Sequence, residues 1–214
     1  QGRLADPADM LAAVGEVLAA AKVGTPLAGR QVLISAGPTR EPIDPVRFLT
    51  NYSSGRMGVA LAEAAREMGA AVTLVYGPAE VPPPDGVTVV DVVTAAEMHA
   101  EMTRRQPEAD LILMTAAVSD YAPAEPAAHK LKKEDATELN IQLQRTTDIL
   151  AELGRHKPAG QVLVGFALES RNAERYGKDK LVKKNLDLIV VNSLEDEGAG
   201  FGHTTNRISL FGRE

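Results

Sequence analysis

Short apolar runs alternate with amphipathic stretches along most of the chain. Apolar runs bounded by turn residues predict buried strands at residues 31–36, 71–76, 87–93, 110–116, 161–167 and 186–192. Apolar residues that recur every three or four positions predict helices at residues 9–22, 56–68, 95–105, 148–153 and 172–185. Two further strands are predicted, a short one at 139–143 and an edge strand at 206–211.

Strands that alternate with helices form βαβ units, so the pattern predicts an α/β fold with a mostly parallel, Rossmann-like sheet and helices on both faces. We assign residues 1–29 to an N-terminal helix and linker and residues 30–214 to the Rossmann-like domain. Residues 37–55 are expected to form a long loop, and 122–136 a polar, lysine-rich segment without a core face. Ligands of such sheets bind beyond the carboxyl ends of the strands, which selects the loops after positions 36, 116, 167 and 192.

The composition of the chain excludes several classes of function. The net charge of -6 argues against a non-specific nucleic-acid binder, which needs a basic face. The absence of Cys excludes disulfides, thiolate catalysis and thiolate metal sites. No run of about 18 apolar residues and no signal peptide are visible, so we expect a cytoplasmic protein with no membrane span. Because the chain starts at Gln1 rather than Met, we expect it to be part of a longer one.

The turn before the second helix is the first candidate site. Ser53 and Ser54 supply hydroxyls, Gly55 permits close backbone approach, and the free N–H groups of a helix start favour an anion. Arg47 and Arg56 add positive charge, so we predict a phosphorylated ligand here. The alternative is that Ser53 or Ser54 simply caps the helix. Neither a P-loop nor the glycine fingerprint of dinucleotide-binding proteins is present.

Three further groups of charged residues are candidates for ligand binding near the carboxyl ends of the predicted strands. Asp120 follows the small residues 116–118 and is a candidate metal or ligand contact, with a turn-initiating aspartate as the alternative. The lysines at 130, 132 and 133 fit a lid over a polyphosphate, although such runs also occur as solvated loops. Lys180 and Lys184 share a helix face, where either a bound anion or solvent would relieve their repulsion.

Together these segments resemble the CTP-using phosphopantothenoylcysteine synthetases (phosphopantothenate–cysteine ligases), the synthetase half of bacterial bifunctional coenzyme A biosynthesis proteins. The matching stretches run in family order, at 35–47, 51–58, 116–121, 130–133, 164–166 and 180–187. The resemblance implies that the carboxylate of 4′-phosphopantothenate attacks the α-phosphate of CTP, giving an acyl-cytidylate and pyrophosphate. The amine of L-cysteine then attacks the acyl carbon and releases CMP.

The resemblance also implies Mg²⁺, a homodimer with contacts from residues 40–50 and the last strand, and fusion to a flavin-dependent decarboxylase half. Only the ligase step is assigned to this chain, because it has no Cys to serve as the proton donor of the decarboxylase.

Residue roles follow from the same matching positions. Asn51 corresponds to the asparagine that holds the acyl-cytidylate, Lys130 to the lid lysine, and Arg47 and Ser53 flank Asn51. Asp120 corresponds to the aspartate that binds CTP. From the residues themselves, Asp120 is also the candidate Mg²⁺ ligand, and Ser53, Ser54 and Gly55 are expected to hold a phosphate. The implied nucleotide-binding residues are Met114, Thr115, Ala116, Asp120, Lys130, Thr147, Asp148, Ile149, Leu150, Phe166, Lys180 and Lys184. Thr147 departs from the family, which often has proline there, so this turn is expected to be less rigid.

Two alternative functions would require sequence features that differ from those found here. An NAD(P)-dependent oxidoreductase would carry the glycine fingerprint and an acidic residue after the second strand, where Tyr76, Gly77 and Pro78 stand instead. A non-catalytic nucleotide-binding module would not need Asn51, Lys130 and Asp120 together.

Overall fold

The central feature of the protein is a seven-stranded sheet with the order β11-β10-β9-β6-β1-β4-β5. The computed structural model describes residues 25–132, 138–169, 173–193 and 208–213. The strands are β1 (Gln31–Ala36), β4 (Ala71–Tyr76), β5 (Thr88–Asp91), β6 (Leu111–Met114), β9 (Val162–Glu169), β10 (Leu188–Ser193) and β11 (Ile208–Gly212). Neighbouring strands are parallel except β10 and β11 at one edge. The direction of strand addition therefore reverses between β1 and β6, as in a Rossmann fold, and the predicted fold class is confirmed.

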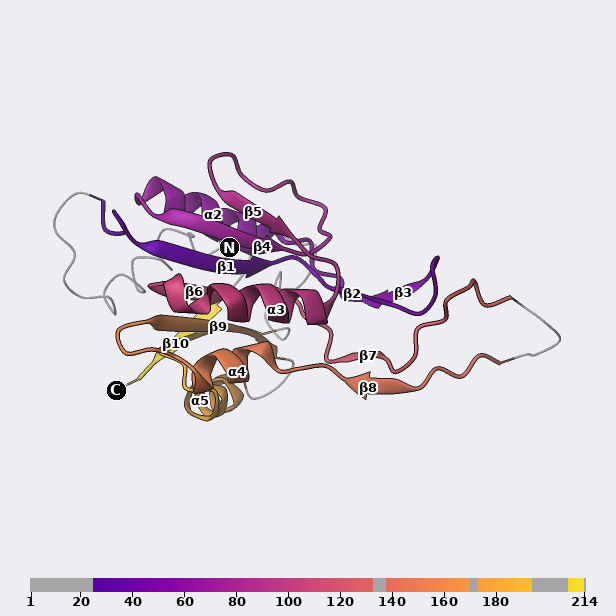
Figure 1. Ribbon diagram of the computed structural model, residues 1–214. Coiled ribbons are helices and arrows are strands. Elements are labelled where there is room, and N and C mark those ends of the chain that lie inside the picture. Colours follow the sequence, from indigo (N-terminus) through magenta and orange to yellow (C-terminus); the bar gives the residue numbers. More distant parts are fainter. Residues whose placement is uncertain (1–24, 133–137, 170–172, 194–207, 214) are drawn as a thin grey trace, which may run out of the picture.

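Helices cover both faces of this sheet (Figure 1). Helix α2 (Arg56–Glu67) packs Leu61 and Ala65 on one face, in a core with Ile34 and Leu74. The other face carries α3 (Ala95–Arg105), α4 (Ile149–Arg155) and α5 (Ala173–Lys183), with the 3₁₀ turn η1 (Gln106–Glu108) after α3. The sequence of β6 is continuously apolar because both of its faces are buried. Leu111 and Leu113 face α2, while Ile112 and Met114 face the helices on the other side.

A close contact brings α2 onto the ends of β1 and β6. A Cβ atom at Gly58 would lie 2.2 Å from the Cβ of Ala36 and 2.5 Å from Oγ1 of Thr115. Real Cβ atoms do not approach so closely, so only glycine permits this packing. The start of α2 is thereby held beside the carboxyl ends of both strands.

Two small antiparallel ribbons extend beyond the carboxyl ends of the central strands (Figure 1). The first, β2 (Arg40–Pro42) with β3 (Phe48–Thr50), lies in the segment expected to be a plain loop. The second pairs β7 (Tyr121–Pro123) with β8 (Leu143–Arg145), so the strand predicted at 139–143 is placed too early. Strands of three residues are too short to show periodicity, and the pairing that defines them comes from distant partners.

The other boundaries differ from the expected ones by a few residues. The predicted edge strand at 206–211 appears as β11, and Asp148 caps α4 rather than beginning it. The helix predicted at 9–22 lies outside the described residues. Within the described ranges, no helix has the length and apolar character needed to cross a membrane.

Candidate active site

A pocket of about 430 Å³ lies at the carboxyl ends of β6 and β9. Nucleotide-sized ligands occupy pockets of roughly 300–1,000 Å³, so the volume suits one. Most of the residues matched to nucleotide binding line it, namely Met114, Ala116, Asp120, Thr147, Asp148, Ile149, Leu150, Phe166 and Lys184. The lining also contains Val118 and Tyr121, which belong to the matched stretch 116–121 but were given no role. Two further lining residues, Arg145 and Thr146, were not singled out from the sequence.

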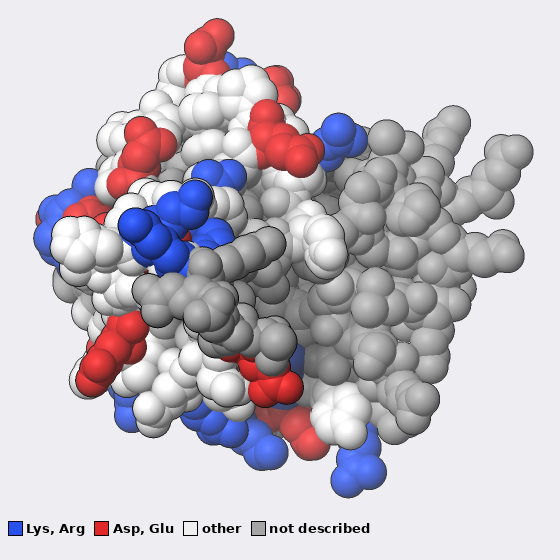
Figure 2. Space-filling view, turned by 90° about the vertical axis from the view of Figure 1, so that its right-hand side faces the viewer, with Lys and Arg blue, Asp and Glu red and all other residues white. Residues whose placement is uncertain are grey.

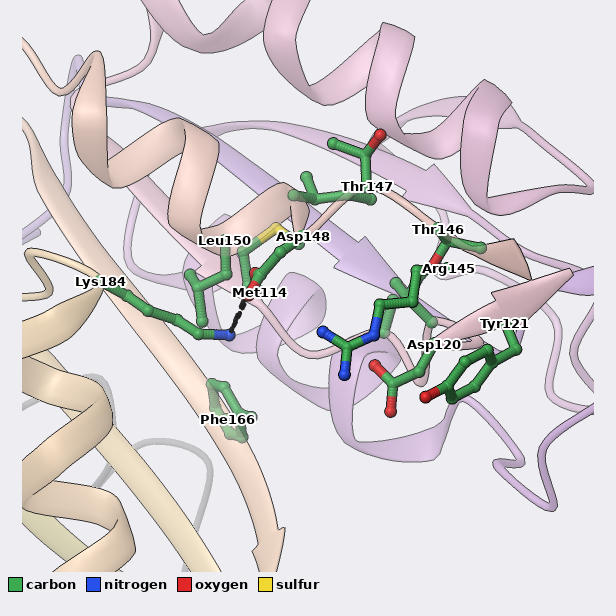
Figure 3. A pocket seen from close by; sticks show the side chains of 13 residues that line it. Met114, Asp120, Tyr121, Arg145, Thr146, Thr147, Asp148, Leu150, Phe166 and Lys184 are labelled. Atoms are coloured by element: carbon green, nitrogen blue, oxygen red, sulfur yellow. Dashed lines mark hydrogen bonds and ion pairs between the residues drawn. The ribbon is translucent and has the colours of Figure 1, made fainter. Parts of the chain in front are cut away.

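Both apolar and charged side chains line the pocket (Figure 3). Met114 ends β6, Phe166 lies on β9 and Leu150 on α4, and their side chains turn toward the cavity. Arg145 and Lys184 reach in from opposite sides. This combination of apolar and cationic side chains suits a ligand that has a flat apolar part and an anionic part.

Lys184 is held in the pocket by an ion pair with Asp148. Its Nζ lies 3.0 Å from Oδ1 and 2.9 Å from Oδ2 of that carboxylate. The same carboxylate accepts a hydrogen bond from the backbone N–H of Ala151 at 3.0 Å and so caps α4. The end of α5 is also fastened to α4, because the Asn185 side chain donates to the Gly154 carbonyl at 2.7 Å. Lys184 is thus positioned by tertiary contacts between the two helices.

The β7–β8 ribbon forms the opposite rim. Tyr121 and Arg145 are paired across the two strands. Thr146 fixes this end of the ribbon, since its N–H donates to the Asp120 carbonyl at 3.0 Å and its hydroxyl to the Ser119 carbonyl at 2.6 Å. Asp120 and Arg145 are therefore held at the pocket mouth by backbone bonds.

The turn after β3 is joined to the loop that follows β6. Asn51 donates from Nδ2 to the Ala117 carbonyl at 2.9 Å, and Ala117 lies between two pocket-lining residues. Gly55 occupies the N-cap of α2 with a left-handed φ of 79°, and no side chain caps this helix. The alternative of capping by Ser53 or Ser54 is therefore wrong: Ser53 Oγ accepts only a 3.4 Å bond from the Gly55 N–H. This leaves the helix start available to an anion.

Arg47 lies away from the pocket lining and holds another segment in place. Its guanidinium binds the buried carboxylate of Asp44 and donates to the Leu131 carbonyl at 2.9 Å. Asp44 also accepts from the Leu131 N–H at 3.1 Å. The Arg47 guanidinium and these N–H donors hold the pKa of Asp44 well below its usual range, although burial opposes them. Sequence reasoning missed Asp44, whose only signal was its place between two prolines near Arg47.

The segment that carries Lys130 is anchored on both sides of this lysine. The Ala127 N–H donates to the Ile43 carbonyl at 2.9 Å, and Leu131 is held by Asp44 and Arg47. Lys130 itself is exposed and does not line the pocket. Its lid role stays a prediction.

Two other predicted contacts also lie off the pocket lining. The hydroxyl of Thr115 donates to the Ser35 carbonyl at 2.6 Å and faces α2. Lys180 lies one helical turn before Lys184, and it is partly exposed. Direct nucleotide contact by either residue therefore stays a prediction.

A metal ion in this site would need help from a ligand. No group of three His, Asp or Glu side chains is arranged for a metal among the residues that the structure describes. Mg²⁺ in nucleotide sites is commonly held by one or two carboxylates together with phosphate oxygens. Asp120, which forms no ion pair within the described ranges, fits that shared arrangement.

The side of the molecule that bears the ribbons is electrostatically uneven. Figure 2 shows a compact cluster of Lys and Arg on the described surface, with Asp and Glu set apart around it. A local positive region of this kind can attract an anionic ligand to a protein whose net charge is -6.

Comparison with known proteins agrees with this architecture. Residues 27–214 match the family described as DNA/pantothenate metabolism flavoprotein C-terminal domain. The coenzyme A biosynthesis bifunctional protein CoaBC of Bacillus subtilis (strain 168) is 45% identical over 212 residues, which cover 99% of this chain and 52% of that protein. A cysteine/cysteine sulfinic acid decarboxylase from an unknown prokaryotic organism is 49% identical over 212 residues, covering 98% of this chain and 59% of that protein. The chain thus spans just over half the length of these relatives.

Solved structures show the same fold. The crystal structure of the C-terminal domain of CoaBC superposes with a TM-score of 0.74 at 42% identity, covering 89% of this chain and 85% of that one. A mutant Cab2 in complex with phosphopantothenate-cysteine shares the fold with a TM-score of 0.68 at 15% identity, covering 95% of this chain and 83% of that one. These matches confirm the resemblance found in the sequence. The chain belongs to the DNA/pantothenate metabolism flavoprotein C-terminal domain family, the C-terminal domain of CoaBC-type proteins.

Proposed function

We propose that this domain ligates 4′-phosphopantothenate to L-cysteine at the expense of CTP, through an acyl-cytidylate, in coenzyme A biosynthesis. The observation that carries the proposal is the pocket at β6 and β9, which gathers nine residues matched to CTP binding from four separate segments. Its CoaBC relatives are bifunctional proteins of coenzyme A biosynthesis, which supports the same assignment.

The pocket suits a nucleoside triphosphate. Phe166 and Met114 offer an apolar surface for a base, while Lys184 offers positive charge for a phosphate. A triphosphate needs several cations around it, because its charge must be neutralised before a carboxylate can approach. When bound, Mg²⁺ would be held by Asp120 and would supply Lewis-acid stabilisation of the phosphate charge.

The first step joins the acid to the nucleotide. A carboxylate oxygen of 4′-phosphopantothenate bonds to the α-phosphorus, and the bond from that phosphorus to the bridging oxygen breaks, releasing pyrophosphate. Lys130, on the anchored segment beside Arg47, closes over the phosphates and neutralises the charge that develops. Arg47 acts in this scheme by holding the backbone next to Lys130.

The second step forms the amide. The cysteine amine bonds to the acyl carbon, loses a proton, and CMP leaves with the electrons of its acyl–oxygen bond. The hydrogen bond from Asn51 to Ala117 places Asn51 next to the loop after β6, which lines the pocket. Among the described residues, the Oδ1 atom of Asn51 has no hydrogen-bond partner. That side chain is therefore available to hold the activated acyl group or the incoming amine. Ser53, Ser54 and Gly55 hold a phosphate at the start of α2.

The wider assembly is proposed on the same basis. The relatives' bifunctional character supports a fusion to a flavin-dependent decarboxylase half, and one relative carries a decarboxylase name. We propose only ligation for this chain, because it has no Cys to serve as the proton donor of a decarboxylase. The exposed Val46 and Phe48 on the first ribbon support a homodimer through residues 40–50.

Pyrophosphate release tests the ligase function directly. The protein is incubated with Mg²⁺, 4′-phosphopantothenate and either CTP or ATP, with and without L-cysteine. We expect release with CTP, and formation of 4′-phosphopantothenoylcysteine only when cysteine is present. If no nucleotide releases pyrophosphate, the proposal is wrong. Equal release without 4′-phosphopantothenate would indicate simple hydrolysis of the nucleotide instead.

A further inference from the structure

Arg145 is a charged pocket residue to which the proposed reaction assigns no role. It lies at the end of β8 and extends its guanidinium into the cavity, opposite Lys184 (Figure 3). We propose that Arg145 binds the polyphosphate chain of the nucleotide and is the main cation of the pocket for that purpose. This inference rests on the proposed use of a nucleoside triphosphate.

The backbone of Arg145 is fixed although its side chain is exposed. Arg145 pairs with Tyr121 in the β7–β8 ribbon. The bonds from Thr146 to Asp120 and Ser119 flank this pair. Tyr121 and Arg145 form a non-hydrogen-bonded pair, because the Thr146 N–H and Asp120 carbonyl are bonded at the next position, so their side chains lie on one face of the ribbon. The guanidinium is thus directed into the pocket, and no described residue forms a hydrogen bond or ion pair with it that a ligand would have to break.

The two cations of the pocket differ in availability. Lys184 is already neutralised by Asp148, with both carboxylate oxygens within 3.0 Å of its Nζ. Arg145 forms no ion pair with any side chain in the described ranges. A phosphate that recruits Lys184 must compete with Asp148, whereas a phosphate that recruits Arg145 displaces no carboxylate partner among the described residues.

The chemistry of the side chain suits phosphate recognition. A guanidinium presents several N–H donors in a plane and can bind two phosphate oxygens at once, which an ammonium group cannot do. Asp120 lies at the same rim and is not paired with Arg145, so it remains free for Mg²⁺. Arg145 and an Asp120-bound Mg²⁺ would then neutralise different oxygens of one polyphosphate.

Binding measurements with three ligands test this role. Calorimetry in Mg²⁺ buffer compares CTP, cytidine and inorganic tripolyphosphate for wild type, Arg145→Gln, Arg145→Lys and a control, Arg155→Gln. Arg155 is an exposed arginine of α4 outside the pocket lining, so its variant makes the same charge change elsewhere. For Arg145→Gln we expect CTP and tripolyphosphate to bind about 10- to 100-fold more weakly, with cytidine unchanged. Arg145→Lys should lose less, because it keeps the charge but not the paired donors.

Each outcome is decisive. Unchanged CTP and tripolyphosphate binding in Arg145→Gln overturns the inference, as does an equal loss for cytidine or the same loss in Arg155→Gln. If wild type binds tripolyphosphate through Arg145 but no CTP, the polyphosphate site stands and the CTP-dependent function fails. If wild type binds none of the three ligands, both proposals fail.

Discussion

The side-chain amide of Asn51 donates to the backbone carbonyl of Ala117 across 2.9 Å. Ala117 is itself bonded to the loop after β1, since its carbonyl accepts from Thr39 and its N–H donates to Gly37 at 3.0 Å. Hydrogen bonds therefore connect Asn51 to the loop that contains Ala116 and Val118, and both of these residues line the pocket. An acid held at the turn after β3 would lie next to a nucleotide held at β6.

Replacement of Asn51 by Ala should separate binding from chemistry. We expect amide formation to slow by about 100- to 1,000-fold, as when a single polar group that contacts the transition state is removed. CTP affinity should change little, because Asn51 is not in the pocket lining. Rapid-quench measurement of 4′-phosphopantothenoylcysteine, beside calorimetry with CTP, checks both points. Turnover equal to wild type would remove Asn51 from the site.

Lys130→Ala should lower kcat/KM by about tenfold or more, because a cation that closes over the phosphates is lost. Its unfolding free energy should change by less than about 0.5 kcal/mol, since the side chain is exposed. Lys132→Ala is the matched control, an exposed lysine two positions away in the same segment. Equal effects of the two variants would mean that only the general charge of the segment matters.

Lys184→Gln should raise the KM for CTP by about tenfold, because a donor that lines the pocket is removed. Asp148 still caps α4 through Ala151, so the fold should persist. Lys180→Gln, one turn earlier and off the lining, should have a smaller effect. Steady-state kinetics over a range of CTP concentrations distinguishes the two, and a larger effect at Lys180 would contradict the pocket geometry.

Asp44→Asn should lower the melting temperature at neutral pH and reduce activity by loosening the segment before Lys130. The depressed pKa means that folding favours the ionised carboxylate of Asp44. Its contribution is present above the unfolded aspartate pKa of about 3.9 and is lost as the pH falls through the lower folded pKa. The difference in melting temperature between variant and wild type should therefore shrink below about pH 4. A pH-independent difference would show that the charge is irrelevant, and the exposed Asp179→Asn serves as control.

Chelation of Mg²⁺ should abolish pyrophosphate release, and Asp120→Asn should raise the Mg²⁺ concentration needed for half-maximal release. Asp148→Asn is the control in the same pocket, because asparagine also caps helices and this carboxylate is engaged by Lys184. A Mg²⁺ titration of both variants makes the comparison. If Asp148→Asn alone shifts the midpoint, the metal lies at Asp148 instead of Asp120.

The α/β class, the order of the main strands along the chain and most residues of the pocket could be predicted from the amino-acid sequence alone. Hydrophobic periodicity is a local property, so β1, β6 and the helix at α2 could be recognised from a few consecutive residues each. The stretch from Thr147 to Leu150 was recognised because a family resemblance compares short segments, and those four residues all line the cavity.

Which side chains lie together in space follows from the folded structure and not from local sequence patterns. Arg145 lies 25 positions after Asp120 and stands beside it because β7 pairs with β8, in a register that no local pattern announces. Asp44 acquires its role from Arg47 and from a backbone 87 residues away. Lys184 enters the pocket, and Lys180 does not, because the contact of α5 with α4 sets the direction of that helix end. Such arrangements depend on packing between distant segments, so they follow from the folded chain and not from its periodicity.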